Sequence, residues 1–113
     1  MRISLKEAQA KLPFPATKEW PEGVWHTLGF GHGSMTVELF TPRDRDYQIS
    51  HQQDELYIVL KGSGVLLVEG VRHPFEAGDA LFVAANQVHR FEKFSQDLVT
   101  WAVFWGPRDG DKV

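Results

Sequence analysis

The chain contains no cysteine, no excess of positive charge and no long apolar run. Without cysteine it has no disulfide, no thiolate catalysis and no cysteine-ligated metal centre, which fits a reducing compartment. With 12 basic against 15 acidic residues, the net charge of −3 argues against nucleic-acid or anionic-membrane partners. No segment approaches the ~20 apolar residues of a membrane span, and the first residues form no apolar signal segment. We therefore expect a cytoplasmic protein.

The overall composition is that of an ordinary globular domain. The 113 residues are 42% hydrophobic and 24% charged, without a biased tract. A chain of this length buries roughly two thirds of its unfolded surface, so it can form a core without disulfides or structural metals. We expect a single domain.

The N-terminal third predicts one short helix followed by an extended arm. Ser4 and Glu7 have the spacing of a capping box, and apolar residues recur at helical intervals over residues 4–12. Pro13 ends this helix, because proline lacks the backbone N–H that a helix interior needs. We expect residues 1–34, as helix and arm, to pack on the body of the protein.

The rest of the chain predicts short strands separated by glycine, proline and asparagine. Many short strands at this spacing are typical of an antiparallel sandwich or barrel, so the fold class is all-β. We expect a barrel over residues 35–105 and a frayed polar tail over residues 106–113. The expected strands cover residues 35–41, 46–51, 55–61, 64–69, 80–84, 89–94 and 98–105.

Two histidines and one carboxylate lie at the ends of expected strands. At ~3.3 Å per residue, His51 and Glu55 on one straight strand would be ~13 Å apart, so they can meet only if residues 52–54 turn. His89 follows a second turn at Asn86, and asparagine tolerates a left-handed backbone. Two imidazoles and one carboxylate form the ligand set of many open metal sites. These residues therefore predict a site for one divalent metal ion in the barrel mouth.

These segments resemble the two motifs of the cupin superfamily, G-x5-H-x-H-x(3,4)-E-x6-G and G-x5-P-x-G-x2-H-x3-N. His51, Glu55 and Gly62 match the second histidine, the glutamate and the closing glycine of the first motif. Gly78 and His89 match the first glycine and the histidine of the second. The chain looks most like small single-domain cupins that carry His-x-Gln-Asp-Glu. The resemblance implies a jelly-roll barrel, usually a homodimer, often holding Fe, Mn, Ni or Zn in its mouth.

The chain departs from these motifs at four positions. Ile49 replaces the first histidine, which leaves three protein ligands and places an apolar side chain beside the site. Either the metal keeps open positions for water and substrate, or its affinity falls and it becomes optional. Gln53 is a weaker candidate ligand, because amides bind transition metals poorly. Ala84, Asn86 and Lys93 replace the proline, glycine and asparagine of the second motif, which concern the turn and the scaffold.

Strand alternation adds candidates for the pocket. Residues two positions beyond Glu55 and His89 should point to the same inward face, which places Tyr57 and Phe91 at its border. Side chains of the last expected strand, residues 98–105, alternate between two faces. One face is wholly apolar and contains Trp101, so we expect Trp101 to form a wall of the pocket. We expect the other histidines to be structural or exposed: His26, His32 and His73.

Three functions are consistent with these residues. The first is a metal-dependent enzyme with dioxygenase-like or isomerase-like chemistry on a small organic molecule. The alternative is a non-catalytic module that binds a small ligand or metal, which Ile49 favours. In a metal-free protein the three residues would form a hydrogen-bonded polar cluster. A metal-free sugar-nucleotide epimerase ranks last, because neither a paired tyrosine acid nor a basic phosphate-binding patch is evident.

Overall fold

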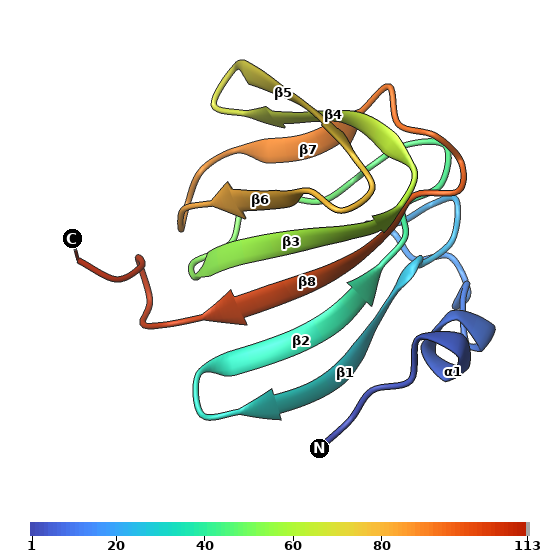
Figure 1. Ribbon diagram of the computed structural model, residues 1–113, viewed down its shortest axis with the longest axis horizontal. Coiled ribbons are helices and arrows are strands. Elements are labelled where there is room, and N and C mark those ends of the chain that lie inside the picture. The colour runs from blue at the N-terminus through green and yellow to red at the C-terminus, as the bar shows by residue number, and fades with distance from the viewer. Residues whose placement is uncertain (113) are drawn as a thin grey trace.

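A computed structural model describes residues 1–112 as two antiparallel sheets that face each other (Figure 1). One sheet has five strands in the order β1-β2-β8-β3-β6, and the other has three in the order β5-β4-β7. The prediction of an all-β antiparallel barrel with a short N-terminal helix is confirmed. The elements are α1 (Leu5–Ala10), β1 (His26–His32), β2 (Met35–Phe40), β3 (Asp54–Lys61), β4 (Ser63–Val68), β5 (Val71–Glu76), β6 (Ala80–Val83), β7 (His89–Glu92) and β8 (Val99–Trp105).

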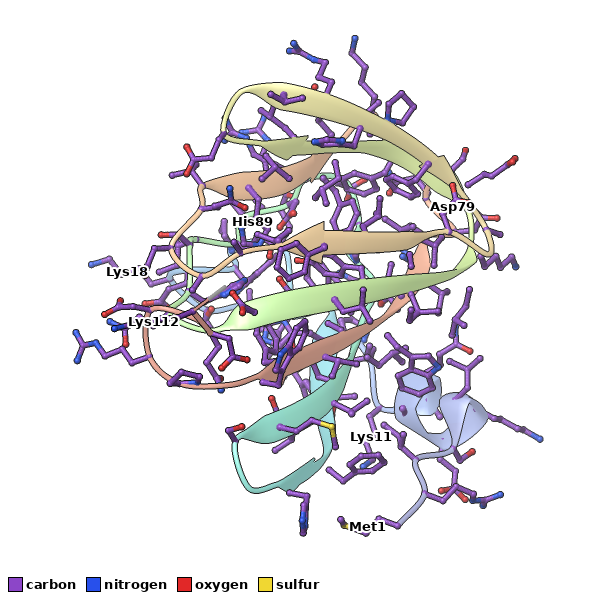
Figure 2. All side chains as sticks on the ribbon, turned by 60° about the vertical axis from the view of Figure 1, so that its left-hand side comes forward. Met1, Lys11, Lys18, Asp79, His89 and Lys112 are labelled. Carbon is purple, nitrogen blue, oxygen red and sulfur yellow. The ribbon has the colours of Figure 1, made fainter. Side chains whose placement is uncertain are left out.

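The main core fills the space between the two sheets, where Figure 2 shows the side chains from both sides meeting. Alternate residues of each strand point into this space, as the two-residue period of a strand requires. Tyr57 of β3 and Phe91 of β7 are both fully or almost fully buried there, as expected. The other core residues are Phe40, Val59, Leu66, Val68, Phe75, Val83, Leu98 and Ala102.

The prediction of which β8 face points inward was wrong. Ala102 lies in the main core, whereas Trp101 packs on the outer face of the sheet beside Leu39 and α1. Trp101 is therefore no wall of the site. Apolar character misled the prediction because the outer face of β8 is also apolar, being partly covered by the N-terminal helix.

Three of the sequence-based strand assignments also differ from the structure. Residues 26–32, expected within the arm, form β1 and pair with β2. Residues 71–76, which none of the expected strands covers, form the edge strand β5, where Pro74 is tolerated because an edge strand can lose one ladder N–H. Residues 46–51 form no strand. There the Asp46 carboxylate accepts backbone N–H groups of Gln48 and Phe91, and such side-chain bonds replace a strand ladder.

The N-terminal segment is held to the sheet at both ends of the arm. The hydroxyl of Ser4 accepts a hydrogen bond from the backbone N–H of Glu7, which confirms the predicted helix cap. Further along, Trp20 packs against the main core. Pro13, expected to end the helix, follows its C-terminal turn. No helix within residues 1–112 is long and apolar enough to span a membrane.

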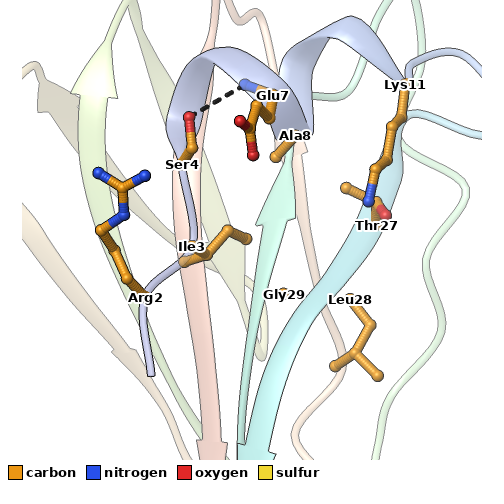
Figure 3. A pocket seen from close by; sticks show the side chains of 9 residues that line it. All are labelled: Arg2, Ile3, Ser4, Glu7, Ala8, Lys11, Thr27, Leu28 and Gly29. Atoms are coloured by element: carbon orange, nitrogen blue, oxygen red, sulfur yellow. Dashed lines mark hydrogen bonds between the residues drawn. The ribbon is translucent and has the colours of Figure 1, made fainter.

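One glycine of β1 allows the helix to approach the sheet closely. Figure 3 shows Ile3 between α1 and the part of β1 that contains Gly29. A side-chain carbon at Gly29 would overlap the end of Ile3 and lie 3.0 Å from the carbonyl oxygen of Val37. The absence of a side chain at this position therefore lets the N-terminal segment rest on the outer face of the five-stranded sheet.

Candidate metal centre

Residues from both sheets meet at one end of the barrel. Glu55 is the second residue of β3 in the five-stranded sheet, and His89 is the first residue of β7 in the three-stranded sheet. His51 lies in the loop before β3, where the chain turns as expected. One ligand atom of each residue lies within 4.8 Å of the other two. The structure therefore brings together the three side chains that the two motifs single out.

Both imidazoles are oriented by backbone carbonyl groups. The Nδ1 atom of His51 lies 2.8 Å from the carbonyl oxygen of Gln53, and that of His89 lies 2.9 Å from the carbonyl oxygen of Gln87. A carbonyl oxygen only accepts hydrogen bonds, so each Nδ1 carries the proton. In a neutral imidazole this leaves the lone pair on Nε2, the atom that faces the site.

The two Nε2 atoms converge on one oxygen of Glu55. His51 Nε2 lies 2.8 Å from Glu55 Oε1, and His89 Nε2 lies 3.2 Å from the same oxygen. The second contact lacks hydrogen-bond geometry, so within residues 1–112 the buried His89 Nε2 has no hydrogen-bond partner. Metal–ligand bonds of about 2.0–2.2 Å place adjacent ligand atoms about 3 Å apart. Both observed separations fit a shared metal ion, and the unpartnered nitrogen is a lone pair available to it.

The charges at the site favour a cation between these groups. Burial by itself raises the pKa of Glu55, but the hydrogen bond with His51 and the nearby His89 imidazole outweigh it and hold that pKa below its ordinary value. Burial lowers the pKa of His89, but the neighbouring carboxylate outweighs it and raises that pKa overall. The Nε2 lone pairs of the two imidazoles would repel the carboxylate oxygen if no positive charge lay between them. Either a proton on each imidazole or a shared metal ion supplies this charge.

The loops that carry the ligands are tied to each other. The backbone N–H of Asn86 donates to the carbonyl oxygen of His51 at 2.7 Å. The Asp54 carboxylate accepts the N–H of Ala85 at 2.9 Å, which joins the start of β3 to the turn before β7. Asn86 has a φ of 67° and Lys93 a φ of 50°. Asn86 and Lys93 therefore both adopt the left-handed backbone that glycine and asparagine, the family's residues at these positions, favour.

The side-chain nitrogen of Gln53 is engaged in loop contacts. It donates to the carbonyl oxygens of Ser34 and Gly106, at 2.9 and 3.0 Å. This amide nitrogen fastens the loop to the ends of neighbouring strands, and the role of Gln53 as a possible ligand stays a prediction. Its backbone carbonyl contributes by orienting His51.

An open cavity of about 180 Å³ is lined by two of the three side chains, His51 and Glu55. Ile49 lines it, as expected for a side chain in place of a ligand, and is 83% exposed. Tyr57 and Phe91 lie in the core beneath it, and Tyr57 donates a hydrogen bond to the pocket residue Gln48. The lining residues are Trp20, His26, Glu38, Phe40, Gln48, Ile49, His51, Glu55 and Phe104.

Several of these lining residues escaped the sequence analysis. Trp20 and His26 belong to the N-terminal third, where His26 was expected to be structural or exposed. Phe104 contacts the His51 ring edge-on at 4.7 Å between ring centres and belongs to the β8 face assigned to the exterior. Glu38 did carry a signal, because it is the single charged residue in the apolar strand β2. Burial, and then Glu55, raise the pKa of Glu38 to about 7.

Comparison with known proteins identifies the family. A family model described as a cupin domain matches residues 36–105, so the chain belongs to the cupin domain family. The chain is 34% identical over 76 residues to the uncharacterized protein SCO3923 of Streptomyces coelicolor. The matched segment covers 66% of this chain and 72% of that protein.

Two solved structures show the same fold at low sequence identity. A Cupin 2 conserved barrel domain protein from Salinispora arenicola is 18% identical with a TM-score of 0.62, over 72% of this chain and 74% of its own. The EutQ protein of Clostridium difficile is 13% identical with a TM-score of 0.67, over 93% of this chain and 80% of its own. The recognition of a cupin domain from its two motifs is thereby confirmed.

We predict that Glu55→Gln lowers the pKa of His89 in metal-free protein, because the variant removes the carboxylate charge that raises this pKa. Burial then lowers the pKa against only the Gln87 carbonyl group and the Asp46 carboxylate. A raised folded-state pKa stabilises the protein fully below pH 6.5, and that contribution is lost as the pH rises through the folded pKa. In the wild type, the free energy of unfolding measured in urea should therefore fall as the pH rises through the folded-state pKa of His89. In Glu55→Gln this dependence on pH should be smaller.

Histidine NMR titration measures this shift directly. Glu92→Gln is the control, because Glu92 lies on β7 but pairs with Arg72 at 2.7 Å, away from the site. An unchanged His89 pKa in Glu55→Gln would show that the carboxylate does not control this imidazole.

Proposed function

We propose that the protein binds one divalent transition-metal ion through His51, Glu55 and His89. The observation that carries this proposal is the convergence of both Nε2 atoms on one carboxylate oxygen, with each Nδ1 proton held by a backbone carbonyl. Two nitrogens and one oxygen suit Fe, Mn, Ni or Zn better than magnesium or calcium, which prefer oxygen ligands.

We further propose that the adjoining cavity binds a small organic molecule. Three protein ligands leave open coordination positions, and Ile49, in place of a fourth ligand, borders the space beside them. A divalent ion here supplies Lewis acidity toward an oxygen of the bound molecule. Glu55 offsets the positive charge, the imidazoles fix the geometry, and Trp20, Phe40 and Phe104 provide apolar walls. This arrangement suits dioxygenase-like or isomerase-like chemistry.

A non-catalytic module that binds a metal or a small ligand is the alternative. The observation that favours it is Ile49, which is 83% exposed at the position where the family's first histidine would add a ligand. Metal-dependent turnover of any small molecule distinguishes the two functions, because a binding module would retain its ligand unchanged. A cytoplasmic location remains a prediction, based on the cysteine-free composition.

We propose that the protein is a homodimer and that its interface is the part of the outer face of the five-stranded sheet formed by Leu56, Phe82 and Val103, away from the N-terminal helix. Leu56 lies opposite Phe82 on one side and opposite Val103 on the other, and all three point away from the core. The rings of Phe82 and Trp105 lie 6.2 Å apart at the edge of the same face, and Phe82 is 57% exposed. A contiguous apolar surface of this kind is typical of protein–protein interfaces.

We expect His51→Ala and His89→Ala each to reduce metal content from about one equivalent to near zero, because two protein ligands hold such ions poorly. Elemental mass spectrometry of untagged protein purified without chelators measures the content. Circular dichroism should show an intact fold in both variants. His73→Ala is the control, since His73 is exposed on β5. Unchanged metal content in either variant would disprove the ligand assignment, and wild-type protein that takes up no metal would disprove the metal centre.

Ile49→His should raise metal affinity by restoring a fourth protein ligand. Even the residues that only orient ligands change affinity by about tenfold, so a new ligand should have at least that effect. A competition titration with a chromophoric chelator measures the change, and Ile49→Leu controls for the loss of the isoleucine itself. Equal or weaker binding in Ile49→His would show that this position does not face the metal.

Phe82→Glu should convert the dimer into a monomer in sedimentation velocity experiments. A charge buried in an apolar interface costs about 2 kcal/mol, a factor of about 30 in the dissociation constant. Val71→Glu is a matched control, because Val71 is also 57% exposed but lies on β5 of the other sheet. A monomeric wild type, or equal effects of both substitutions, would contradict the proposed interface.

A further inference from the structure

One wall of the cavity comes from a loop that lies outside the barrel. Trp20 belongs to the loop of residues 14–24, which joins α1 to β1 (Figure 1). Every other lining residue belongs to β1, β2, β3, β8 or the segment of residues 48–51. A movement of this loop would therefore change one wall of the cavity and leave the candidate metal ligands in place.

The loop is held in shape by its own hydrogen bonds. Phe14 and Val24 form an antiparallel bridge and exchange two backbone hydrogen bonds, at 2.9 and 3.0 Å. The backbone N–H groups of Thr17 and Gly23 both donate to the carbonyl oxygen of Trp20, at 3.0 and 3.1 Å. The Thr17 hydroxyl group accepts the backbone N–H of Trp20 at 3.0 Å. Because these bonds all lie within the loop, it can move as one unit without breaking them.

The middle of the loop is attached to the barrel by one large side chain. Of residues 13–22, Trp20 alone is not exposed to solvent. Its ring packs on the main core and contacts Phe40 and Tyr47 at 6.0 Å and His26 at 5.3 Å between ring centres. Glu22 also bonds to the Tyr47 hydroxyl group. Since a hydrogen bond that replaces one to water adds little net stability, the burial of Trp20 is the stronger attachment.

Both ends of the loop are fixed to the body of the protein. Leu12 packs in the cluster beneath α1. The carbonyl oxygen of Trp25 accepts the backbone N–H of Thr41 at 2.8 Å and its hydroxyl group at 3.2 Å. Gly23, beside this second anchor, has a φ of 108°, which residues with side chains rarely adopt. An exposed segment with two fixed ends and few buried contacts between them opens at a lower free energy than the core strands.

We propose that residues 14–24 form a flap over the cavity, that this flap opens as one unit while the barrel stays folded, and that Trp20 is its latch. In the closed form Trp20 is a wall of the cavity. In the open form that wall is absent, so a ligand can enter or leave on this side. The use of the flap in ligand exchange rests on the proposed function, whereas its opening is a property of the free protein.

Hydrogen exchange of single backbone N–H groups, followed by NMR, measures this opening. We expect the hydrogen-bonded N–H groups of the flap to share one protection factor, at least about tenfold below that of the Val59 N–H in the buried part of β3. The reporting N–H groups in the flap are those of Phe14, Thr17, Trp20, Gly23 and Val24.

Substitution of the latch tests its role. Trp20→Ala should speed exchange in the flap by about tenfold or more and leave Val59 unchanged, because the lost packing stabilises only the closed flap. Trp20→Phe should have a smaller effect, since it keeps an aromatic ring against the core. Trp105→Ala is the matched control, because it removes the same side chain from the outer face of the sheet beside Phe82. Its flap should exchange as in the wild type.

The other outcomes would contradict the proposal. Flap protection equal to that of Val59 in the wild type would show that no separate opening occurs, and widely different values within the flap would show that it is not one unit. Unchanged flap exchange in Trp20→Ala would disprove the latch. If Trp20→Ala unfolds the whole protein, Trp20→Phe decides, since an equal loss of protection at Val59 would contradict the proposal. A protein that takes up no metal but whose flap opens would overturn the proposed function alone.

Discussion

The site depends on one shared oxygen atom. Two imidazole nitrogens, one from each sheet's side of the barrel mouth, approach Glu55 Oε1 at 2.8 and 3.2 Å. Nitrogen lone pairs and a carboxylate oxygen at these separations repel unless positive charge lies among them. The backbone carbonyls of Gln53 and Gln87 hold the imidazoles in place, so the repulsion cannot be relieved by turning the rings away. Positive charge, either from protons on the imidazoles or from a metal ion, is therefore part of what this arrangement requires.

The rigidity of this arrangement comes from bonds between the two ligand-bearing loops. The hydrogen bond from Asn86 to His51 and the one from Ala85 to Asp54 join loops that lie far apart in the sequence. The barrel beneath them supplies the buried Tyr57, which is hydrogen-bonded to Gln48 at the cavity. The ligand positions are thus fixed by the same contacts that close this end of the barrel, which is the preorganisation that a binding site needs.

The cavity gains part of its wall from outside the segment that matches the cupin family. The family match covers residues 36–105, whereas Trp20 and His26 precede it. Trp20 reaches the main core and contacts Phe40 and His26 edge-on. The three candidate metal ligands thus lie within the segment that matches the family, whereas part of the cavity wall comes from the N-terminal segment before it.

The sequence by itself determined the all-β fold, the helix cap at Ser4, and the three side chains that converge at the barrel mouth. These are local facts, because turn residues, capping residues and motif spacing act within a few positions of the chain. The tertiary structure alone decided which face of β8 is inside, since both faces are apolar and only packing against α1 distinguishes them. It also decided that Gln53 fastens a loop and that Glu38, Trp20 and His26 share one cavity. Such contacts depend on strand register across the sheet, and no short segment of the sequence encodes that register.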